Sequence, residues 1–338
     1  YDEFSKLKEM DFISIDFSYL ESEKINYQQY LENYEYIKEL SKYGYRFSLC
    51  FGKDDDLSNI NYLTKNFQGD IIVTDIEELC NVTFPSKING NLILKDVKRC
   101  SNLNLPDEVT DTIDMQNIET LEGILMPKKT NKILLNNLKD RDIGNLPQII
   151  TGGIELPALK KIDYIDLSED ISEDIRMPNL KSAVTIICNK KHPGNIDLNS
   201  LELAADIYCY ISKKDYNADM EYNGNIYFNN LELVNNLRLY EKINGSVFLN
   251  SLRKFQTLIC PNIINGDLHI EKLTTLEGAV LPNYVSGKIF VNDILMKKYD
   301  FASICSEVVC VKRDRSYSLN RVNIPLAILF NQSNIRKR

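Results

Sequence analysis

The sequence predicts a mainly β solenoid of about ten coils of roughly 21 residues, with an N-terminal α/β cap. Most of the gaps between recurring glycines are near-multiples of 21 residues, apolar residues recur at fixed offsets from each glycine, and prolines stand where one unit passes into the next. The repeating glycines are Gly90, Gly152, Gly194, Gly224, Gly245, Gly266 and Gly287. Such a period is typical of chains whose units bury their apolar faces only against their neighbours.

Residues 1–80 lie before the repeat and have a β-α-β-α-β order. Strands are expected over 11–17, 45–51 and 71–73, an amphipathic helix over 28–42 and a short helix over 60–67. Solenoids need atypical terminal units for solubility, so we expect a cap that seals the first coil. A small α/β domain with its own site is the alternative.

The repeat occupies residues 81–298. In the unit of Gly90, Ile88 precedes the glycine, Leu92 and Leu94 follow it in alternation, and Val97 begins a run of apolar residues at three-residue steps. Alternation predicts a short strand with one buried face. The glycine is expected at a corner that requires an unusual φ or a close backbone approach. The second half of each unit suits an extended or 3₁₀-like return, because so short a unit leaves little room for an α-helix.

Units that lack the glycine keep the same pattern. Asp111 and Glu173 take its place, and the unit after Pro127 is one residue short, which gives ten coils in all. Residues 299–338 break the register. We expect a C-terminal cap and tail there, with a closing strand over Val308–Val311.

The corners carry a resemblance to a known repeat family. The segments Leu105–Val109 and Leu281–Val285 each begin with Leu-Pro and end with Val. They resemble the corners of irregular bacterial leucine-rich repeats and of receptor-L-domain-like solenoids, over about residues 84–298. The chain lacks the Asn or Cys that normally follows the strand, so a straighter β-solenoid is the alternative to a horseshoe. The resemblance implies a binding surface rather than a particular activity.

Net charge and composition limit the classes of partner that the chain is expected to bind. The net charge is −8 and the basic residues do not cluster beyond 336–338, which argues against nucleic acid or an anionic membrane. No apolar stretch is long enough to span a bilayer. The chain begins with Tyr1 and not Met, so we interpret it as a processed or excised piece. Its Lys-, Asn- and Ile-rich composition, with no Trp, suggests a low-GC genome and a secreted bacterial effector or surface protein.

The eight cysteines do not form a metal or disulfide pattern. Cys100 and Cys260 occupy core positions of the repeat, and Cys50 ends an apolar run. We expect reduced, buried thiols, with a disulfide bridge as the alternative. Unpaired buried thiols favour a cytosolic-type reducing environment, which secretion into a host cell would also provide. We expect no metal and no cofactor.

One outward-facing column is the best candidate for binding. The third residue after each glycine position points away from the core, at Ile93, Asp114, Leu134, Glu155, Arg176, Asp197, Tyr227, Phe248, His269 and Phe290. The last four predict an exposed aromatic ladder, flanked by amides such as Asn229 and Asn250. It is interpreted as a protein or glycan contact surface. Stabilisation of the sheet and coverage by the C-terminal segment are the alternatives.

A second candidate is the long step between Gly194 and Gly224. Its extra residues fall around 212–219 and include Lys213 and Tyr216. Insertions in solenoids map to loops, often on the binding face. A tolerated surface loop is the competing interpretation.

Catalysis finds little support in the sequence. The two histidines, His192 and His269, are far apart in the repeat, and no phosphate loop or hydrolase motif occurs. We therefore expect a non-catalytic module that binds a protein partner. The alternatives are the substrate-recognition part of an enzyme, for example a ubiquitin-ligase-like effector with its chemistry in 1–80 or outside this sequence, and glycan binding.

Overall fold

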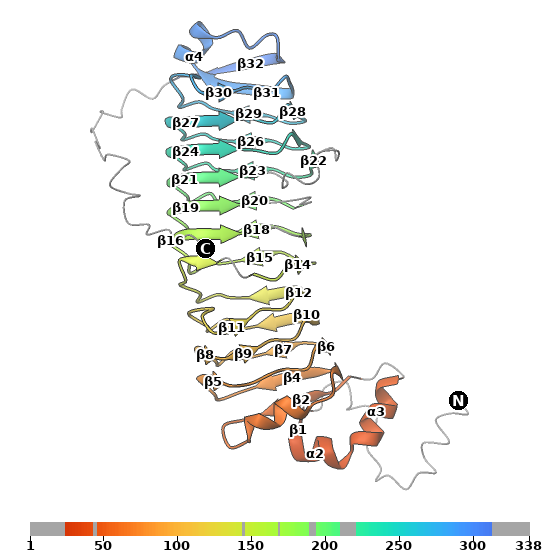
Figure 1. The fold of residues 1–338 in the computed structure, drawn as a ribbon. Coiled ribbons are helices and arrows are strands. Elements are labelled where there is room, and N and C mark those ends of the chain that lie inside the picture. Colours follow the sequence, from red (N-terminus) through yellow and green to blue (C-terminus); the bar gives the residue numbers. More distant parts are fainter. Residues whose placement is uncertain are drawn as a thin grey trace.

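The chain winds into a long, straight stack of coils (Figure 1). The computed structural model describes residues 24–42, 46–143, 146–167, 170–188, 194–209 and 221–312. It contains about 13 turns at a spacing of about 21 residues. The predicted β-solenoid is therefore confirmed, and the stack is straight rather than curved like a horseshoe.

Each complete coil contributes a strand on either side of the glycine corner, and these strands form one 21-stranded sheet. The strands before the corner are β3 (Asn66–Gln68), β6 (Lys87–Asn89), β14 (Ile149–Ile150), β17 (Asp170–Ile171), β22 (Glu221–Tyr222), β25 (Lys242–Ile243) and β28 (Ile263–Ile264). The strands after it are β1 (Lys24–Asn26), β2 (Ser48–Phe51), β4 (Asp70–Val73), β7 (Leu92–Ile93), β15 (Ile154–Glu155), β18 (Ile175–Arg176), β20 (Ile196–Asp197), β23 (Ile226–Tyr227), β26 (Val247–Phe248) and β29 (Leu268–His269).

In a few coils one strand runs through the corner. These strands are β10 (Glu108–Asp114), β12 (Lys129–Leu134), β31 (Tyr284–Asn292) and β32 (Cys305–Val311). The register of β10 against β12 shifts between Val109 and Thr112. The unit after Pro127 is one residue short, and the strand pairing accommodates the missing residue at this shift.

The returning half of the coil is extended, as the sequence predicts. In the later coils it forms a seven-stranded parallel sheet made of β13 (Asp142–Ile143), β16 (Lys161–Asp166), β19 (Ser182–Ile187), β21 (Leu203–Tyr208), β24 (Leu233–Arg238), β27 (Lys254–Ile259) and β30 (Ala279–Val280). Two strand pairs lie on this side in the earlier coils, namely β5 (Glu78–Cys80) with β8 (Arg99–Ser101) and β9 (Leu103–Asn104) with β11 (Ile124–Leu125).

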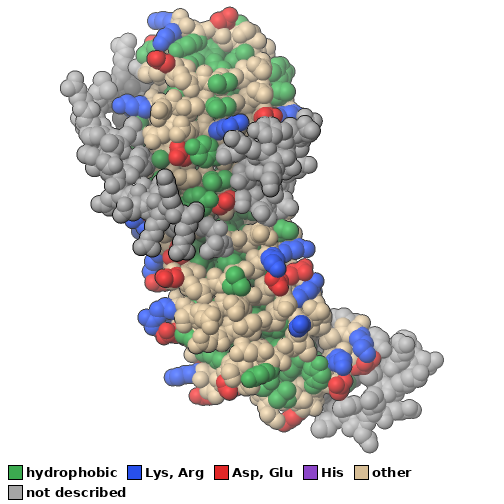
Figure 2. Space-filling view, in the orientation of Figure 1, with side chains coloured by type: hydrophobic (Ala, Val, Ile, Leu, Met, Phe, Trp, Pro, Cys, Tyr) green, Lys and Arg blue, Asp and Glu red, His purple; other side chains and the backbone are tan. Residues whose placement is uncertain are grey.

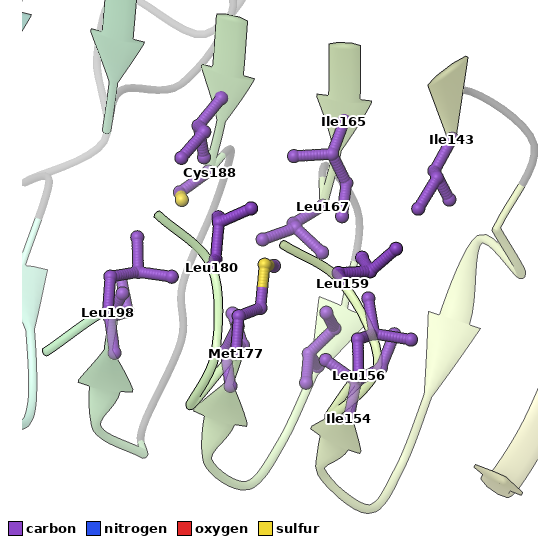
Figure 3. Packing of buried hydrophobic residues seen from close by; sticks show 14 of the residues in the cluster. Ile143, Ile154, Leu156, Leu159, Ile165, Leu167, Met177, Leu180, Cys188 and Leu198 are labelled. Carbon is purple, nitrogen blue, oxygen red and sulfur yellow. The ribbon is translucent and has the colours of Figure 1, made fainter. Parts of the chain in front are cut away.

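The core is a set of apolar columns that run the length of the stack. Strands of successive coils pair in parallel, so equivalent residues lie above one another. One column consists of Ile133, Ile154, Ile175, Ile196, Ile226, Val247, Leu268 and Ile289, all buried. Figure 3 shows Leu156, Met177 and Leu198 filling the interior in the same way. The apolar offsets read from the sequence are thus the core positions.

The repeat glycines are required by a close backbone approach. A Cβ built on Gly245 would lie 2.1 Å from the carbonyl oxygen of Gly224, and one on Gly90 would lie 2.2 Å from that of Gly69. Positive φ angles occur at other glycines, including Gly69, Gly123 and Gly278. The sequence suggests that a repeat glycine is needed either for an unusual φ or for a close backbone approach. At Gly90 and Gly245 the close approach between neighbouring coils is the reason.

The stack extends further at both ends than the ten predicted coils. Strand β4 pairs in parallel with β2 on one side and with β7 on the other, and Gly69 stands one repeat period before Gly90. Helices α2 (Tyr27–Glu32) and α3 (Tyr34–Lys42) lie at this end, and η2 (Leu57–Tyr62) is a 3₁₀ helix within the first coils. The expected strand over 11–17 falls outside the described residues.

At the C-terminal end of the stack, α4 (Asp293–Lys298) follows β31 and precedes β32 (Figure 1). Strand β32 pairs in parallel with β31, so the closing strand predicted over Val308–Val311 is present and begins slightly earlier. Beyond Lys312 the chain lies outside the described residues.

Candidate functional site

The outward column predicted from the sequence forms one unbroken line across the strand face, the outer side of the strands that follow the glycine corner. Strand pairing places its members in succession: Asn26, Cys50, Ile72, Ile93, Asp114, Leu134, Glu155, Arg176, Asp197, Tyr227, Phe248, His269, Phe290 and Val309. Residues far apart in the chain therefore become neighbours in a fixed order.

The four aromatic members, Tyr227, Phe248, His269 and Phe290, form the predicted ladder. The centroids of successive rings lie 4.9, 4.7 and 4.1 Å apart, with interplanar angles of 10°, 22° and 6°. The first two distances match the separation of neighbouring strands, about 4.7–4.9 Å, and the third is shorter. The stacking thus follows from a repeat of constant length between Gly224 and Gly287.

The rings are half-buried, rather than fully exposed as expected, because each covers the faces of its neighbours. The part of each ring that its neighbours do not cover stays exposed, and together these parts form a ridge on the strand face. Sugars usually stack on the open face of an aromatic ring, and the faces of Phe248 and His269 are occupied on both sides. The geometry therefore favours an apolar contact ridge over a glycan platform.

His269 also has a polar partner on its own coil. Its Nδ1 lies 2.8 Å from Oε1 of Glu271, and the two side chains retain only 14% and 16% of their exposure. The contact fixes the imidazole ring in the plane that its aromatic neighbours require. It brings a titratable pair into the ladder.

A row of short polar side chains follows the glycines and joins the coils on one flank of the ladder. Asn225 Oδ1 accepts a hydrogen bond from the backbone amide of Ser246, Ser246 Oγ from that of Asp267, and Asp267 Oδ1 from that of Lys288. The row holds the strand face rigid. This role is absent from the predicted site, although Asn, Asp or Ser directly after a repeat glycine is the sequence signal for it.

On the other flank lies a polar row formed by Asn199, Asn229, Asn250 and Glu271, one from each of four consecutive coils. Asn229 and Asn250 are half-buried instead of freely outward. Nδ2 of Asn229 donates to Oδ1 of Asn199 at 2.7 Å. These amides are thus partly internal to the stack, which limits them as contacts for a partner.

The middle of the column is charged and less regular. Nη2 of Arg176 donates to Oδ2 of Asp174 at 2.6 Å. The backbone amide of Asn195, together with Arg176, holds the pKa of Asp174 below its usual value. A hollow of about 460 Å³ opens here, where Gly153 provides no side chain between Lys132 and Asp174. The hollow is open and its lining carries charges of both signs, so we interpret it as a solvated part of the surface.

Charged side chains also pair between coils at the margins of the molecule (Figure 2). Lys98 Nζ lies 2.7 Å from Oε1 of Glu77, and Lys181 Nζ lies 2.8 Å from Oε1 of Glu202. All four side chains are exposed, so each pair contributes little to stability.

The eight thiols differ in how far they are buried. All eight are free; four are buried, while Cys80 and Cys310 are exposed, contrary to the expected burial. Burial raises the pKa of Cys260 to about 12, and burial with nearby Cys80 raises that of Cys100 to about 12. Within the described ranges, no group of three or more His, Cys, Asp and Glu is placed to hold a metal ion.

Three residues singled out from the sequence, His192, Lys213 and Tyr216, lie outside the described residues, as does the insertion around 212–219. None of the helices in the described part of the chain has the length and apolar character needed to cross a bilayer.

Comparisons of the chain with protein-family models, with curated proteins and with solved structures found no match.

Proposed function

We propose that this solenoid is a non-catalytic module that binds a protein partner through its strand face, with the aromatic ladder as the centre of contact. The observation that supports this most is the ladder itself, a continuous stack of rings that remains partly exposed on the strand face. Interfaces are enriched in aromatic side chains at their centres and are surrounded by polar rims.

The rigidity of the ridge supports the same proposal. Each inner ring is held between two others, and the row after the glycines ties the supporting backbone from coil to coil. A partner would therefore immobilise few side chains on binding. A preorganised surface loses less conformational entropy in association, which leaves more of the contact energy as affinity.

The resemblance to irregular bacterial leucine-rich repeats adds a narrower proposal, that the module belongs to a secreted bacterial effector or surface protein and contacts a host protein. This rests on the Leu-Pro corners and on composition alone.

The test is a comparison of partner capture by two matched variants. In the first, Tyr227, Phe248 and Phe290 are all replaced by Ser. In the second, three exposed apolar residues away from the ladder, Tyr62, Leu125 and Val280, are replaced by Ser. Circular dichroism verifies that both are folded at the assay temperature.

We expect the ladder variant to lose at least about tenfold in affinity for proteins captured by the wild type, and the control variant to keep it, since hot-spot residues typically contribute about 2 kcal/mol or more. Equal capture by the wild type and the ladder variant would contradict the proposal.

A further inference from the structure

Four coils carry the dipeptide Asn-Gly at the glycine corner, beginning at Asn89, Asn223, Asn244 and Asn265. Asn-Gly is chemically labile, because a glycine amide has no Cβ beside it to hinder its attack on the preceding asparagine side chain. Since the dipeptide is the same each time, a difference in lability between the four sites has to come from the fold. Their surroundings in the structure differ.

Three of the four asparagines form a chain of hydrogen bonds along consecutive coils. Nδ2 of Asn265 donates to Oδ1 of Asn244 at 2.7 Å, and Nδ2 of Asn244 donates to Oδ1 of Asn223 at 2.6 Å. Asn244 also donates to Oε1 of Glu221. Asn244 is therefore held at both of its polar atoms, while Asn223 and Asn265 are the two ends of the chain.

The two ends differ in which side-chain atom is engaged. Asn223 accepts through Oδ1, and its Nδ2 has no hydrogen-bond partner among the described residues, whereas Asn265 has the opposite arrangement. Both side chains are exposed. A donor on Oδ1 polarises the carbon Cγ and stabilises the negative charge that develops on Oδ1 during attack. The unengaged Nδ2 is free to take up a proton and leave, so the arrangement at Asn223 favours the reaction.

The attacking nitrogen is not held by the fold at these three corners. In the part of the chain that the structure describes, the backbone amides of their glycines donate no hydrogen bond, whereas the amide of Gly287 in the next coil donates to the carbonyl oxygen of Gly266 at 3.0 Å. The asparagine joins the coils instead, as where the amide of Asn244 donates to the carbonyl oxygen of Tyr222 at 2.7 Å. Reaction of the glycine nitrogen therefore breaks no bond between coils.

The fourth site, at Asn89, is protected in a different way. Gly90 is buried, so the water that completes the reaction does not reach this peptide group freely. The carbonyl oxygen of Asn89 also accepts a hydrogen bond from the amide of Gly69 at 3.2 Å. The main chain is thus fixed on both sides of the reacting atoms.

We propose that Asn223 is a site of spontaneous deamidation and that Asn244 promotes the reaction. The nitrogen of Gly224 bonds to Cγ of Asn223, the Cγ–Nδ2 bond breaks, and ammonia leaves with the proton of the glycine amide. Water then opens the five-membered imide at one of its two carbonyl groups, which gives aspartate or isoaspartate at position 223. The proposal does not depend on the proposed partner.

The product alters the strand face where the ladder begins. Position 223 lies between β22 and β23, and β23 carries Tyr227, the first ring. Isoaspartate adds a methylene group to the main chain at a corner where a Cβ on Gly224 would already lie 2.4 Å from the carbonyl oxygen of Gly194. Either product places a new negative charge two residues from Glu221.

Peptide mass spectrometry of the folded protein, incubated in mildly alkaline buffer, measures conversion at each of the four sites. We expect Asn223 to convert first, ahead of Asn265, Asn244 and Asn89. In concentrated urea, where the hydrogen bonds between coils are lost, we expect the four sites to convert at similar rates. Another asparagine that converts first in the folded protein, or a preference for Asn223 that is equally strong in urea, would overturn the proposal.

The variant Asn244→Ala tests the promoting role, because it removes the donor to Oδ1 of Asn223. We expect conversion at Asn223 to slow about fivefold, as the loss of one hydrogen bond to the reacting group implies. The control is Asn137→Ala, which removes an amide bond of the same kind, from Nδ2 to Oδ1 of Asn117 at 2.8 Å. The control should leave the rate at Asn223 unchanged, and circular dichroism verifies that both variants are folded. An undiminished rate in Asn244→Ala would contradict the role of Asn244.

Discussion

Two stretches of the same outward column differ sharply in what they present. Between Tyr227 and Phe290 the side chains stack ring on ring, whereas between Asp114 and Asp197 the column is largely charged and a hollow opens beside Gly153. The strands pair in parallel in both stretches. The repeat keeps a constant length in the first stretch, but a register shift and a shortened unit interrupt the second. We infer that a constant repeat length is needed for a row of stacked side chains to continue from coil to coil.

The largest expected effect is on the glycine corner that both stretches share. Gly245→Val places a side chain against the carbonyl oxygen of Gly224, which is backbone and cannot move aside. We expect a loss of about 3 kcal/mol or more in the free energy of unfolding, measured by urea denaturation. Gly52→Ala is the control, because the nearest atom to its added Cβ is 3.7 Å away. A harmless Gly245→Val would contradict the close packing of the corners.

The next effect separates the two stretches directly. Phe248→Ala removes a ring with an aromatic neighbour on each side, so we expect it to lose about 1–3 kcal/mol of stability. Glu155→Ala, at the equivalent position in the charged stretch, is expected to stay within about 0.5 kcal/mol of the wild type. Equal losses in denaturant unfolding would mean that stacking contributes nothing beyond the sheet itself.

A smaller effect is expected from acid titration in the charged stretch. The folded-state pKa of Asp174 lies below its usual value because of the Asn195 amide and Arg176, so its contribution is present at neutral pH and is lost as pH falls below about 4. We expect Asp174→Asn to show a flatter decline in melting temperature between pH 5 and pH 3. An unchanged slope would show that Asp174 plays no part in acid sensitivity.

The smallest effect concerns the pairs at the margins. Lys98→Gln breaks an exposed ion pair with Glu77, and we expect a change of at most about 0.5 kcal/mol, reduced further in high salt. A loss above about 1 kcal/mol in thermal unfolding would assign these cross-coil charges a structural role.

Much of the fold was readable from the sequence because each coil repeats the same physical demands. Apolar offsets such as Ile88, Leu92 and Leu94 identified the core, and the position three after the glycine identified the ladder. The stack already includes β2 and β4, before the predicted start of the solenoid at residue 81, and Gly69, one period before Gly90, is the sequence signal for it. The repeat is masked there by helices and a 3₁₀ turn.

The candidate site was only partly predictable. Alternation showed which residues point outward, yet not that rings one repeat period apart would cover each other and become half-buried. The inward turn of Asn229 and Asn250 also depends on side-chain rotamers and on the neighbouring coil, which one sequence does not specify. The binding role of the ladder, with that of Lys213 and Tyr216, stays a prediction.

The central claim is that residues distant in sequence are stacked in register. Spin labels on Lys161 and Lys254, exposed members of one column four coils apart, test it by double electron–electron resonance after Cys80 and Cys310 are replaced by Ser. At about 4.8 Å per coil, the backbone positions lie roughly 19 Å apart. A single narrow distribution near that distance, broadened only by the label linkers, is the predicted result. A broad distribution, or one centred at twice that distance or more, would contradict the stacked coil.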